Sequence, residues 1–326
     1  MARPTATETA PPATRRLALV DLWRGIAIVA MVVYHFAWDL SYYQLIATDV
    51  TTDPGWVLLQ RCILSSFLLL VGVSLVLGHG SGIRWPAFRR RLGVLAAAAL
   101  AVTAGTWWMF PDYFVFFGIL HAIALFSLMA LPFLRVPPLA VLAAAALFLV
   151  PPLLWSAPGF SAKPLAWIGF WTTLPDTTDI VPVFPWFGVV LIGVALARLA
   201  LATPLAGRLA AWQPRAALSR VLILCGRWSL LIYLLHQPTL LGGVMLVTQL
   251  NPPVLQPEVL SREEGFVQSC EASCAQGKPA AYCTAYCGCA IEQVDAGNLW
   301  DMLDRPGPER DAALAPVTRL CAAMAE

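Results

Sequence analysis

A histidine and an aspartate stand one helical turn apart inside an apolar stretch of the chain. His35 and Asp39 lie in residues 17–43, which otherwise have the composition of a membrane-spanning helix. Arg24 and Asp21 fall on the same narrow stripe of that helix, at about 100° per residue. His35 lies roughly 16 Å beyond Arg24 along the axis. Ionisable groups at membrane depth are costly, so the stripe predicts a functional site.

Proton transfer is the chemistry that suits this stripe. Neutral histidine has a pKa close to physiological pH, and a carboxylate one turn away can fix its tautomer and raise its basicity. His35, oriented by Asp39, would take a proton from a hydroxyl or amine that attacks an acyl carbonyl, or would accept the acyl group itself. The alternative is a structural role, in which His35 only hydrogen-bonds between helices.

The composition is that of a membrane protein. Of the 326 residues, 59% are hydrophobic and only 12% are charged, and the mean hydropathy is +0.71. A soluble domain carries about a quarter charged residues. Backbone groups in lipid must bond within the protein, so an all-α bundle of transmembrane helices is expected. The arginines are scattered at helix ends and give no indication of nucleic-acid binding.

Seven apolar segments are long enough to be read as spans. They are residues 19–43, 56–78, 92–110, 115–134, 138–156, 182–202 and 220–248. The transmembrane domain therefore covers 15–250, after an Ala-, Pro- and Thr-rich segment, 1–14, that is expected to be disordered. An acidic tail, 251–326, completes the chain.

The distribution of arginine predicts the orientation. Loops with Arg15, Arg16, Arg84, Arg89, Arg90, Arg91, Arg135, Arg198, Arg208, Arg215 and Arg220 alternate with loops that hold mostly aspartate. The positive-inside rule places the N-terminus in the cytoplasm, and seven spans place the tail outside. We expect a bacterial inner-membrane protein with a periplasmic tail. The connection 157–181 would lie outside, as an interfacial or re-entrant segment or as a loop with a tryptophan belt.

Further polar residues are expected at the outer side with His35. His121 lies early in the fourth span and His236 late in the seventh, while Arg61 lies near the outer start of the second. The topology therefore predicts an outward-facing polar cavity shared by these side chains.

The inner side offers cations. Arg24 would pair with Asp21, extend to the interface, or bind a phosphate of a cytoplasmic cofactor. Arg227 precedes His236 by nine residues, which puts the two on opposite faces of one helix. Ser229, rather than Arg227, is therefore expected to share a cavity with His236.

The tail contains a regular cysteine pattern. Cys270, Cys274, Cys283 and Cys287 form C-x3-C, eight residues, C-x3-C, and Cys289 and Cys321 follow. Cysteines four apart share a helix face, so two antiparallel helices joined by two disulfides are expected, in an oxidising compartment. A zinc site is the alternative, but the spacing of three and the lack of histidine in the tail argue against it. The pairing of the six cysteines remains open, and no metal is expected.

Four segments resemble a known family in the same order. They are DLWRGIAIVAMVVYHFAWDL, FGILHAIALFSL, FPWFGVVLIGVALA and GRWSLLIYLLHQP. The first resembles the first span of the transmembrane acyltransferase superfamily, where an Arg, ten residues and a His match Arg24 and His35. Together the segments are similar to the bacterial heparan-alpha-glucosaminide N-acetyltransferase catalytic-domain family, over residues 15–250.

The resemblance implies acyl transfer from cytoplasmic acyl-CoA, acetyl-CoA in particular, to an acceptor at or across the membrane. It marks His35 as catalytic, Arg24 as part of the motif, and His121 and His236 as motif residues with less defined roles. In the lysosomal branch the active histidine lies near the lumenal end of the first span, and 44–55 holds no histidine. The glucosaminide substrate is therefore not carried over.

Three functional readings follow from the sequence. The first is an acyltransferase that modifies a glycan or lipid acceptor of the envelope and is surrounded by membrane lipid. The second is a transporter or proton-coupled carrier that uses the same polar stripe as a relay. The third is an assembly protein that acts through its tail. Each is compatible with a homo-oligomer.

Overall fold

The computed structural model describes residues 17–250, 262–275, 277–303 and 307–325. The predicted disorder at 1–14 lies outside these residues. The chain separates into two compact units, Met1–Pro252 and Pro253–Glu326. The described residues form helices and contain no strand, so the all-α prediction is confirmed.

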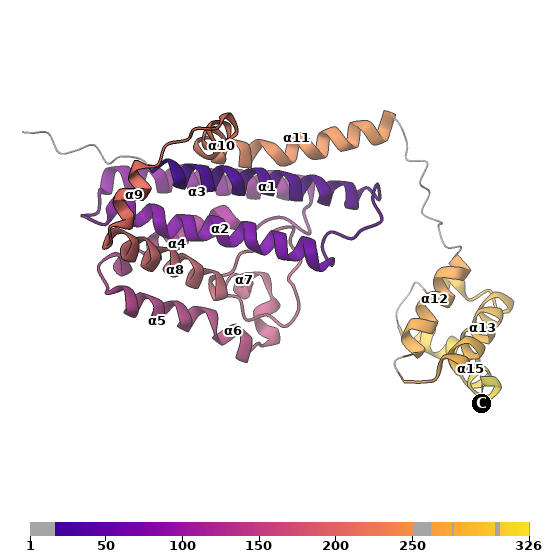
Figure 1. Cartoon of the computed structure of the whole chain (residues 1–326). Helices are drawn as coiled ribbons and strands as arrows, with labels where there is room; N and C mark the ends of the chain where they lie inside the picture. Colours follow the sequence, from indigo (N-terminus) through magenta and orange to yellow (C-terminus); the bar gives the residue numbers. More distant parts are fainter. Residues whose placement is uncertain (1–16, 251–261, 276, 304–306, 326) are drawn as a thin grey trace, which may run out of the picture. The chain divides into compact units, whose positions relative to one another are not determined.

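The first unit is a helical bundle. Its main helices run along a roughly common direction in Figure 1. They are α1 (Ala18–Tyr42), α2 (Pro54–His79), α3 (Trp85–Met109), α4 (Ile119–Met129), α5 (Pro138–Leu149), α8 (Val183–Leu201) and α11 (Ser229–Leu250). Short helices connect them: η1 (Pro132–Leu134), α6 (Pro151–Leu154), η2 (Pro158–Ser161), α7 (Lys163–Ala166), α9 (Leu205–Ala211) and α10 (Ala217–Arg227).

Five of these helices are long and apolar enough to cross a membrane, namely α1, α2, α3, α8 and α11. The segments Ile119–Met129 and Pro138–Leu154 are shorter apolar helices. A span needs about 20 residues at about 1.5 Å each. All seven predicted apolar segments thus contain helix, and five of the helices are long and apolar enough to span a membrane.

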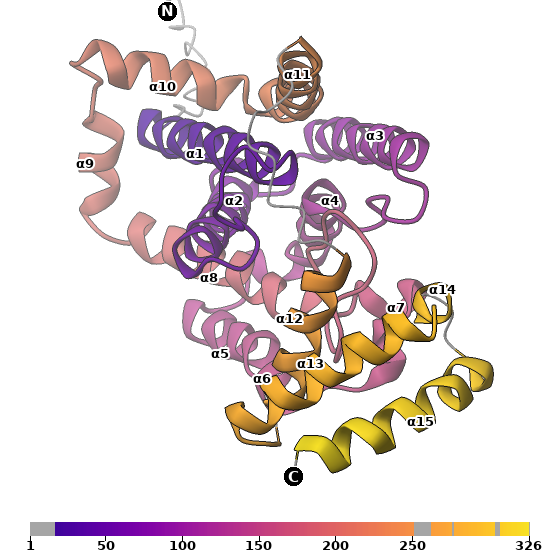
Figure 2. The ribbon, with the colours of Figure 1, turned by 90° about the vertical axis from the view of Figure 1, so that its right-hand side faces the viewer.

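The predicted seventh span, 220–248, is wrong as a single helix. The helix is interrupted at Trp228, where α10 ends and α11 begins. Figure 2 shows α11 nearly end-on while α10 runs across the bundle. Both helices pack on α1: α10 meets it near Asp21 and Gly25, and α11 meets it further along, near His35 and Asp39.

Two glycines permit the crossing of α1 and α10. A side chain at Gly25 would overlap the carbonyl oxygen of Leu222, and a side chain at Gly226 would overlap the carbonyl oxygen of Asp21. Both glycines are buried. The two backbones therefore approach as closely as helices without side chains allow, which is a common device in membrane proteins.

Replacing Gly25 with alanine should therefore destabilise the bundle by about 1–3 kcal/mol or more, the range typical of overpacking. Thermal unfolding in detergent, followed by loss of the monodisperse peak, measures the effect. Gly242→Ala is the matched control, because a Cβ at Gly242 on α11 meets nothing within 4 Å. That control should be neutral or slightly stabilising, since alanine is the better helix former. Equal melting temperatures for the two variants would contradict the crossing.

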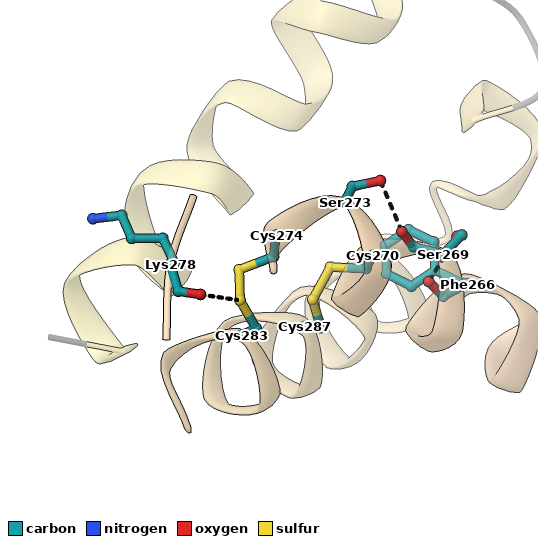
Figure 3. The surroundings of a disulfide bond; sticks show 8 residues. All are labelled: Phe266, Ser269, Cys270, Ser273, Cys274, Lys278, Cys283 and Cys287. Carbon is teal, nitrogen blue, oxygen red and sulfur yellow. Dashed lines mark hydrogen bonds between the residues drawn. A yellow bond between two sulfur atoms is a disulfide. The ribbon is translucent and has the colours of Figure 1, made fainter. Parts of the chain in front are cut away.

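The second unit is a small helical domain held by disulfides. It contains α12 (Arg262–Cys274), α13 (Ala280–Ala296), α14 (Trp300–Leu303) and α15 (Pro308–Ala325). Two bridges, Cys270–Cys287 and Cys274–Cys283, join α12 to α13, as Figure 3 shows. The predicted hairpin with two disulfides is confirmed.

A third bridge, Cys289–Cys321, joins α13 to α15. Spacing along one helix could not predict this pair, because Cys321 lies on another helix, 32 residues after Cys289. The apolar core around this bridge is small, with Ala290, Phe266, Tyr286 and Val317 beside the two cysteines. A core of this size contributes little, so the covalent links carry much of the stability of the domain.

Replacing Cys289 and Cys321 together with serine should free α15. The chain-entropy model gives a cost of about 4 kcal/mol for a bridge with a sequence separation of 32. Limited proteolysis of the full-length protein should then cut within 308–325 at protease concentrations that leave the wild type intact. Serine at the free cysteines Cys62 and Cys225 is the control and should not change the pattern. Protection of α15 in the double variant would show that packing alone holds it.

Candidate active site

An arginine-rich cavity of about 750 Å³ lies between α1, α2, α3, α4 and the start of α11. Among the described residues that line it, five are arginines and one, Asp21, is acidic; the arginines are Arg24, Arg84, Arg90, Arg91 and Arg227. Its other walls are mainly apolar. Such a cavity suits a ligand that has an anionic group at one end and an apolar or uncharged part at the other.

Asp21 organises two of these arginines. Its carboxylate accepts from Arg24 at 2.9 Å and lies 3.4 Å from Nε of Arg227, and only 8% of the residue is exposed. Arg24 also donates to the hydroxyl of Ser74 on α2, at 3.2 Å. The predicted pairing of Arg24 with Asp21 is thus present, and Arg24 lines the cavity as well. The ion pair with Asp21 holds the Arg24 guanidinium in place, and Arg24 still lines the cavity.

The other arginines come from the start of α3. Arg84 donates to the carbonyl of Gly78 at 3.0 Å. Arg90 and Arg91 make no side-chain hydrogen bond or ion pair within the described part of the chain, and Arg91 lies close enough to Arg24 for their charges to repel. The N-terminal end of α3 adds the positive end of a helix dipole. Concentrated unpaired positive charge of this kind is stabilised by a bound anion.

These arginines were not predicted to form a site. Arg84, Arg90 and Arg91 were interpreted as a signal of topology, and Arg227 was expected to lie on a different helix face from Ser229. The structure corrects the second point, because Arg227 and Ser229 both line the cavity while His236 does not. The helix periodicity used to compare Arg227 with His236 does not continue across the interruption at Trp228, so it could not predict which residues share the cavity. The close spacing of four arginines in residues 84–91 was the available signal for the first point.

His35 on α1 and His236 on α11 come together as predicted. Their ring centroids lie 4.8 Å apart, with an angle of 65° between the planes. Nδ1 of His236 lies 2.6 Å from the carbonyl oxygen of Tyr233. A carbonyl only accepts, so Nδ1 carries the proton and Nε2 keeps its lone pair. Nε2 is buried and has no hydrogen-bond partner among the described residues.

Asp39 has a different partner from the one expected. Its Oδ1 accepts a 2.6 Å hydrogen bond from Nε2 of Gln237 on α11. The expected hydrogen bond between Asp39 and His35 is not found in the described structure, where the fully buried Asp39 (0% exposed) is bonded to α11 instead. Gln237 was not predicted as a site residue. It follows His236 directly and so lies in the same helix turn, which meets Asp39.

Three buried atoms near the histidine pair lack partners. They are Oδ2 of Asp39, Nε2 of His236 and Oε1 of Gln237. Each of the three is an acceptor, given the hydrogen bonds that the same side chains make. A buried acceptor without a donor costs about 1–3 kcal/mol. The group that best complements this cluster is one that brings several N–H or O–H donors.

His121 and Arg61 do not join this cluster. Nε2 of His121 lies 3.2 Å from Oγ1 of Thr103 on α3, and that hydroxyl donates to the carbonyl of Val115 at 2.7 Å. The structure gives no contact between His121 and either His35 or His236 in the described residues. Arg61 is exposed on α2. The predicted convergence therefore holds for two of the three histidines.

The connection 157–181 positions the start of α4, which carries His121. Oδ2 of Asp179 accepts from the backbone N–H of Ile119 at 3.0 Å. Burial raises the pKa of the Asp179 carboxyl to about 6, although this hydrogen bond opposes the shift. The amide of Val181 also donates to the carbonyl of Phe117 at 3.0 Å. The connection is thus bonded to the loop before α4.

The arginine cavity and the histidine pair both lie in a part of the chain that matches a known sequence family. Residues 16–238 match the family model described as "Heparan-alpha-glucosaminide N-acetyltransferase, catalytic". The chain belongs to this family. It is a family of transmembrane acetyltransferases, so the protein is a membrane-bound transferase enzyme. No curated protein and no solved structure gives a significant match.

The family match covers residues of the first unit only. It includes the arginine cavity and the histidine pair, and it ends one residue after Gln237. The disulfide unit lies outside it. The acetyltransferase assignment therefore concerns the helical bundle.

Gln237→Leu should destabilise the bundle by about 1.5–3 kcal/mol, because it removes a hydrogen bond to a buried carboxylate. The same substitution in an Asp39→Asn background should cost less, since no charge is then left without its donor. Thermal unfolding of the two single variants and the double variant gives the coupling energy. A coupling near zero would show that the Gln237–Asp39 hydrogen bond contributes nothing.

Proposed function

We propose that the enzyme transfers an acetyl or other acyl group from cytoplasmic acyl-CoA to a glycan or lipid acceptor of the cell envelope. The observation that carries the proposal is the arrangement of two sites joined by one residue. Tyr233 lines the arginine cavity, and its ring centroid lies 5.6 Å from that of His236. An anion held by the arginines could thus present a second end to the histidine pair.

The arginine cavity supports acyl-CoA as the donor. A guanidinium forms paired hydrogen bonds with phosphate oxygens and stays charged at any relevant pH. Arg24, Arg90 and Arg91 would hold the phosphates of the nucleotide end. His35 lies roughly 16 Å along α1 from Arg24, a distance that suits the long, flexible arm of the coenzyme. The apolar walls of the cavity would receive that arm.

The histidine pair supports the chemical step. The acceptor oxygen or nitrogen attacks the thioester carbonyl, and its proton passes to a histidine. The C–S bond then breaks, and the thiolate leaves and takes up a proton. As a base, His35 receives that proton; as an acyl acceptor, it would attack the carbonyl first with loss of the thiolate, and the acceptor would then displace the acyl group from it and lose its proton to the freed imidazole. His236 assists it with a lone pair whose position is set by the Tyr233 carbonyl. Asp39 is held by Gln237 and acts on the acceptor side.

The three unpartnered acceptors support an acceptor substrate that is rich in donors. Amines and hydroxyls of glycans and lipid headgroups have such donors. Oδ2 of Asp39 and Oε1 of Gln237 would bind neighbouring N–H or O–H groups, while Nε2 of His236 faces the reacting one. Binding would then satisfy atoms that are otherwise a cost to the fold.

The disulfides support the orientation that the arginines predict. Three bridges require an oxidising compartment, so the second unit would lie outside the cytoplasm, in the periplasm of a bacterial cell. The arginine cavity would open toward the cytoplasm from the inner membrane, where acyl-CoA is found. Surrounding membrane lipid would cover the apolar faces of the long helices.

The proposal is tested with purified protein in lipid nanodiscs. His35→Ala should abolish label transfer from acetyl-CoA to an envelope extract but leave coenzyme A binding unchanged. Arg90→Ala combined with Arg91→Ala should weaken coenzyme A binding by about tenfold or more, since each loses charge-assisted hydrogen bonds. Calorimetry measures the binding, and thin-layer autoradiography measures the transfer.

Arg208→Ala is the matched control for the arginine variants. Arg208 is exposed on α9 and does not line the cavity. It should bind coenzyme A as the wild type does. Full transfer by His35→Ala would contradict the assignment of the histidine pair. Proton-coupled solute uptake without any coenzyme A binding would instead favour the carrier.

A further inference from the structure

Tyr233 stands between the two halves of the site. It lines the arginine cavity, whereas neither His35 nor His236 does. Tyr233 packs against two apolar clusters, one that includes Ile28 and Met31 of α1 and one that includes Leu95 of α3 and Leu120 of α4. The side chain therefore fills the space between the end of the cavity and the histidine pair.

The position of Tyr233 is fixed by its backbone as well as by its ring. Its carbonyl accepts the 2.6 Å hydrogen bond from Nδ1 of His236, one turn further along α11. A movement of this backbone would change the tautomer and the direction of His236. The ring is also packed from both sides, so it behaves as a wall and not as a mobile side chain.

The cavity that Tyr233 lines has mainly apolar walls away from the arginines. Ile28, Phe67, Ile119 and Leu120 are among its lining residues. A thioester that enters from the arginine end must bring its carbonyl to the edge of the Tyr233 ring to meet His236. The acyl chain beyond that carbonyl then has only the room that the ring leaves free.

We propose that Tyr233 limits the length of the acyl group, so that the enzyme selects short acyl thioesters such as acetyl over medium-chain ones. The inference rests on the proposed function and names the residue that decides the substrate class. It requires the aromatic ring and not the hydroxyl. Tyr233 is thus a specificity-determining residue and does not itself take part in the proton transfer.

The test compares acetyl-CoA with hexanoyl-CoA as donors for the wild-type protein and its variants in nanodiscs. Tyr233→Ala should raise the ratio of kcat/KM for hexanoyl to that for acetyl by about tenfold or more, because a single methylene in an apolar pocket already changes selectivity by about 10–200-fold. Tyr233→Phe keeps the ring and should keep the wild-type ratio. Leu231→Ala removes volume from an exposed position of α11 and should also leave the ratio unchanged.

Each outcome decides the inference. An unchanged ratio in Tyr233→Ala, or a ratio raised equally in Tyr233→Phe, would overturn the role of the ring. Wild-type protein that uses hexanoyl-CoA as well as acetyl-CoA would do the same. Should Tyr233→Ala not fold, Tyr233→Leu leaves a smaller side chain and should raise the ratio in the same direction. Wild-type protein that transfers no acyl group from either donor would instead refute the proposed function.

Discussion

The close crossing of α1 and α10 is the constraint on which the arginine cavity depends. Gly25 and Gly226 let the two backbones meet. The crossing brings Arg227 beside Asp21, which already holds Arg24. The helix is interrupted at Trp228, directly after Arg227, and α11 starts there in a new direction. The crossing therefore shapes the wall of the cavity next to the start of the helix that carries His236.

The site separates its charges by depth, and the energetics of the membrane give a reason. Arginines at the end of a bundle can reach water or phosphate, so their cost is low. A buried carboxylate further along the bundle has no such access, and Asp39 is accordingly bonded to Gln237. Between these regions the polar groups are few, with Tyr233 as the link. The proposed transfer of a neutral acyl group from a charged donor to a polar acceptor rests on this arrangement.

The disulfide unit follows a different physical principle from the bundle. Its described helices have a small apolar core, and three covalent bridges replace the packing that a larger domain would have. The bundle needs no such links, because lipid and close helix packing stabilise it. Its described cysteines, Cys62 and Cys225, are free. The two units thus differ in what stabilises them, and they differ in charge as well, since the bundle carries more basic and the tail more acidic residues.

The sequence by itself determined the helical class, the apolar segments, the paired cysteines of the α12–α13 hairpin and the family. These depend on composition and on spacing along one helix, where 100° per residue is a reliable guide. It also predicted that His35 would meet His236, because topology placed both toward the same side. Tertiary structure decided the rest. The interruption at Trp228 overruled the helical wheel for Arg227, and the partner of Asp39 came from α11 instead of its own helix. Packing between distant segments sets such contacts, and no local periodicity records them.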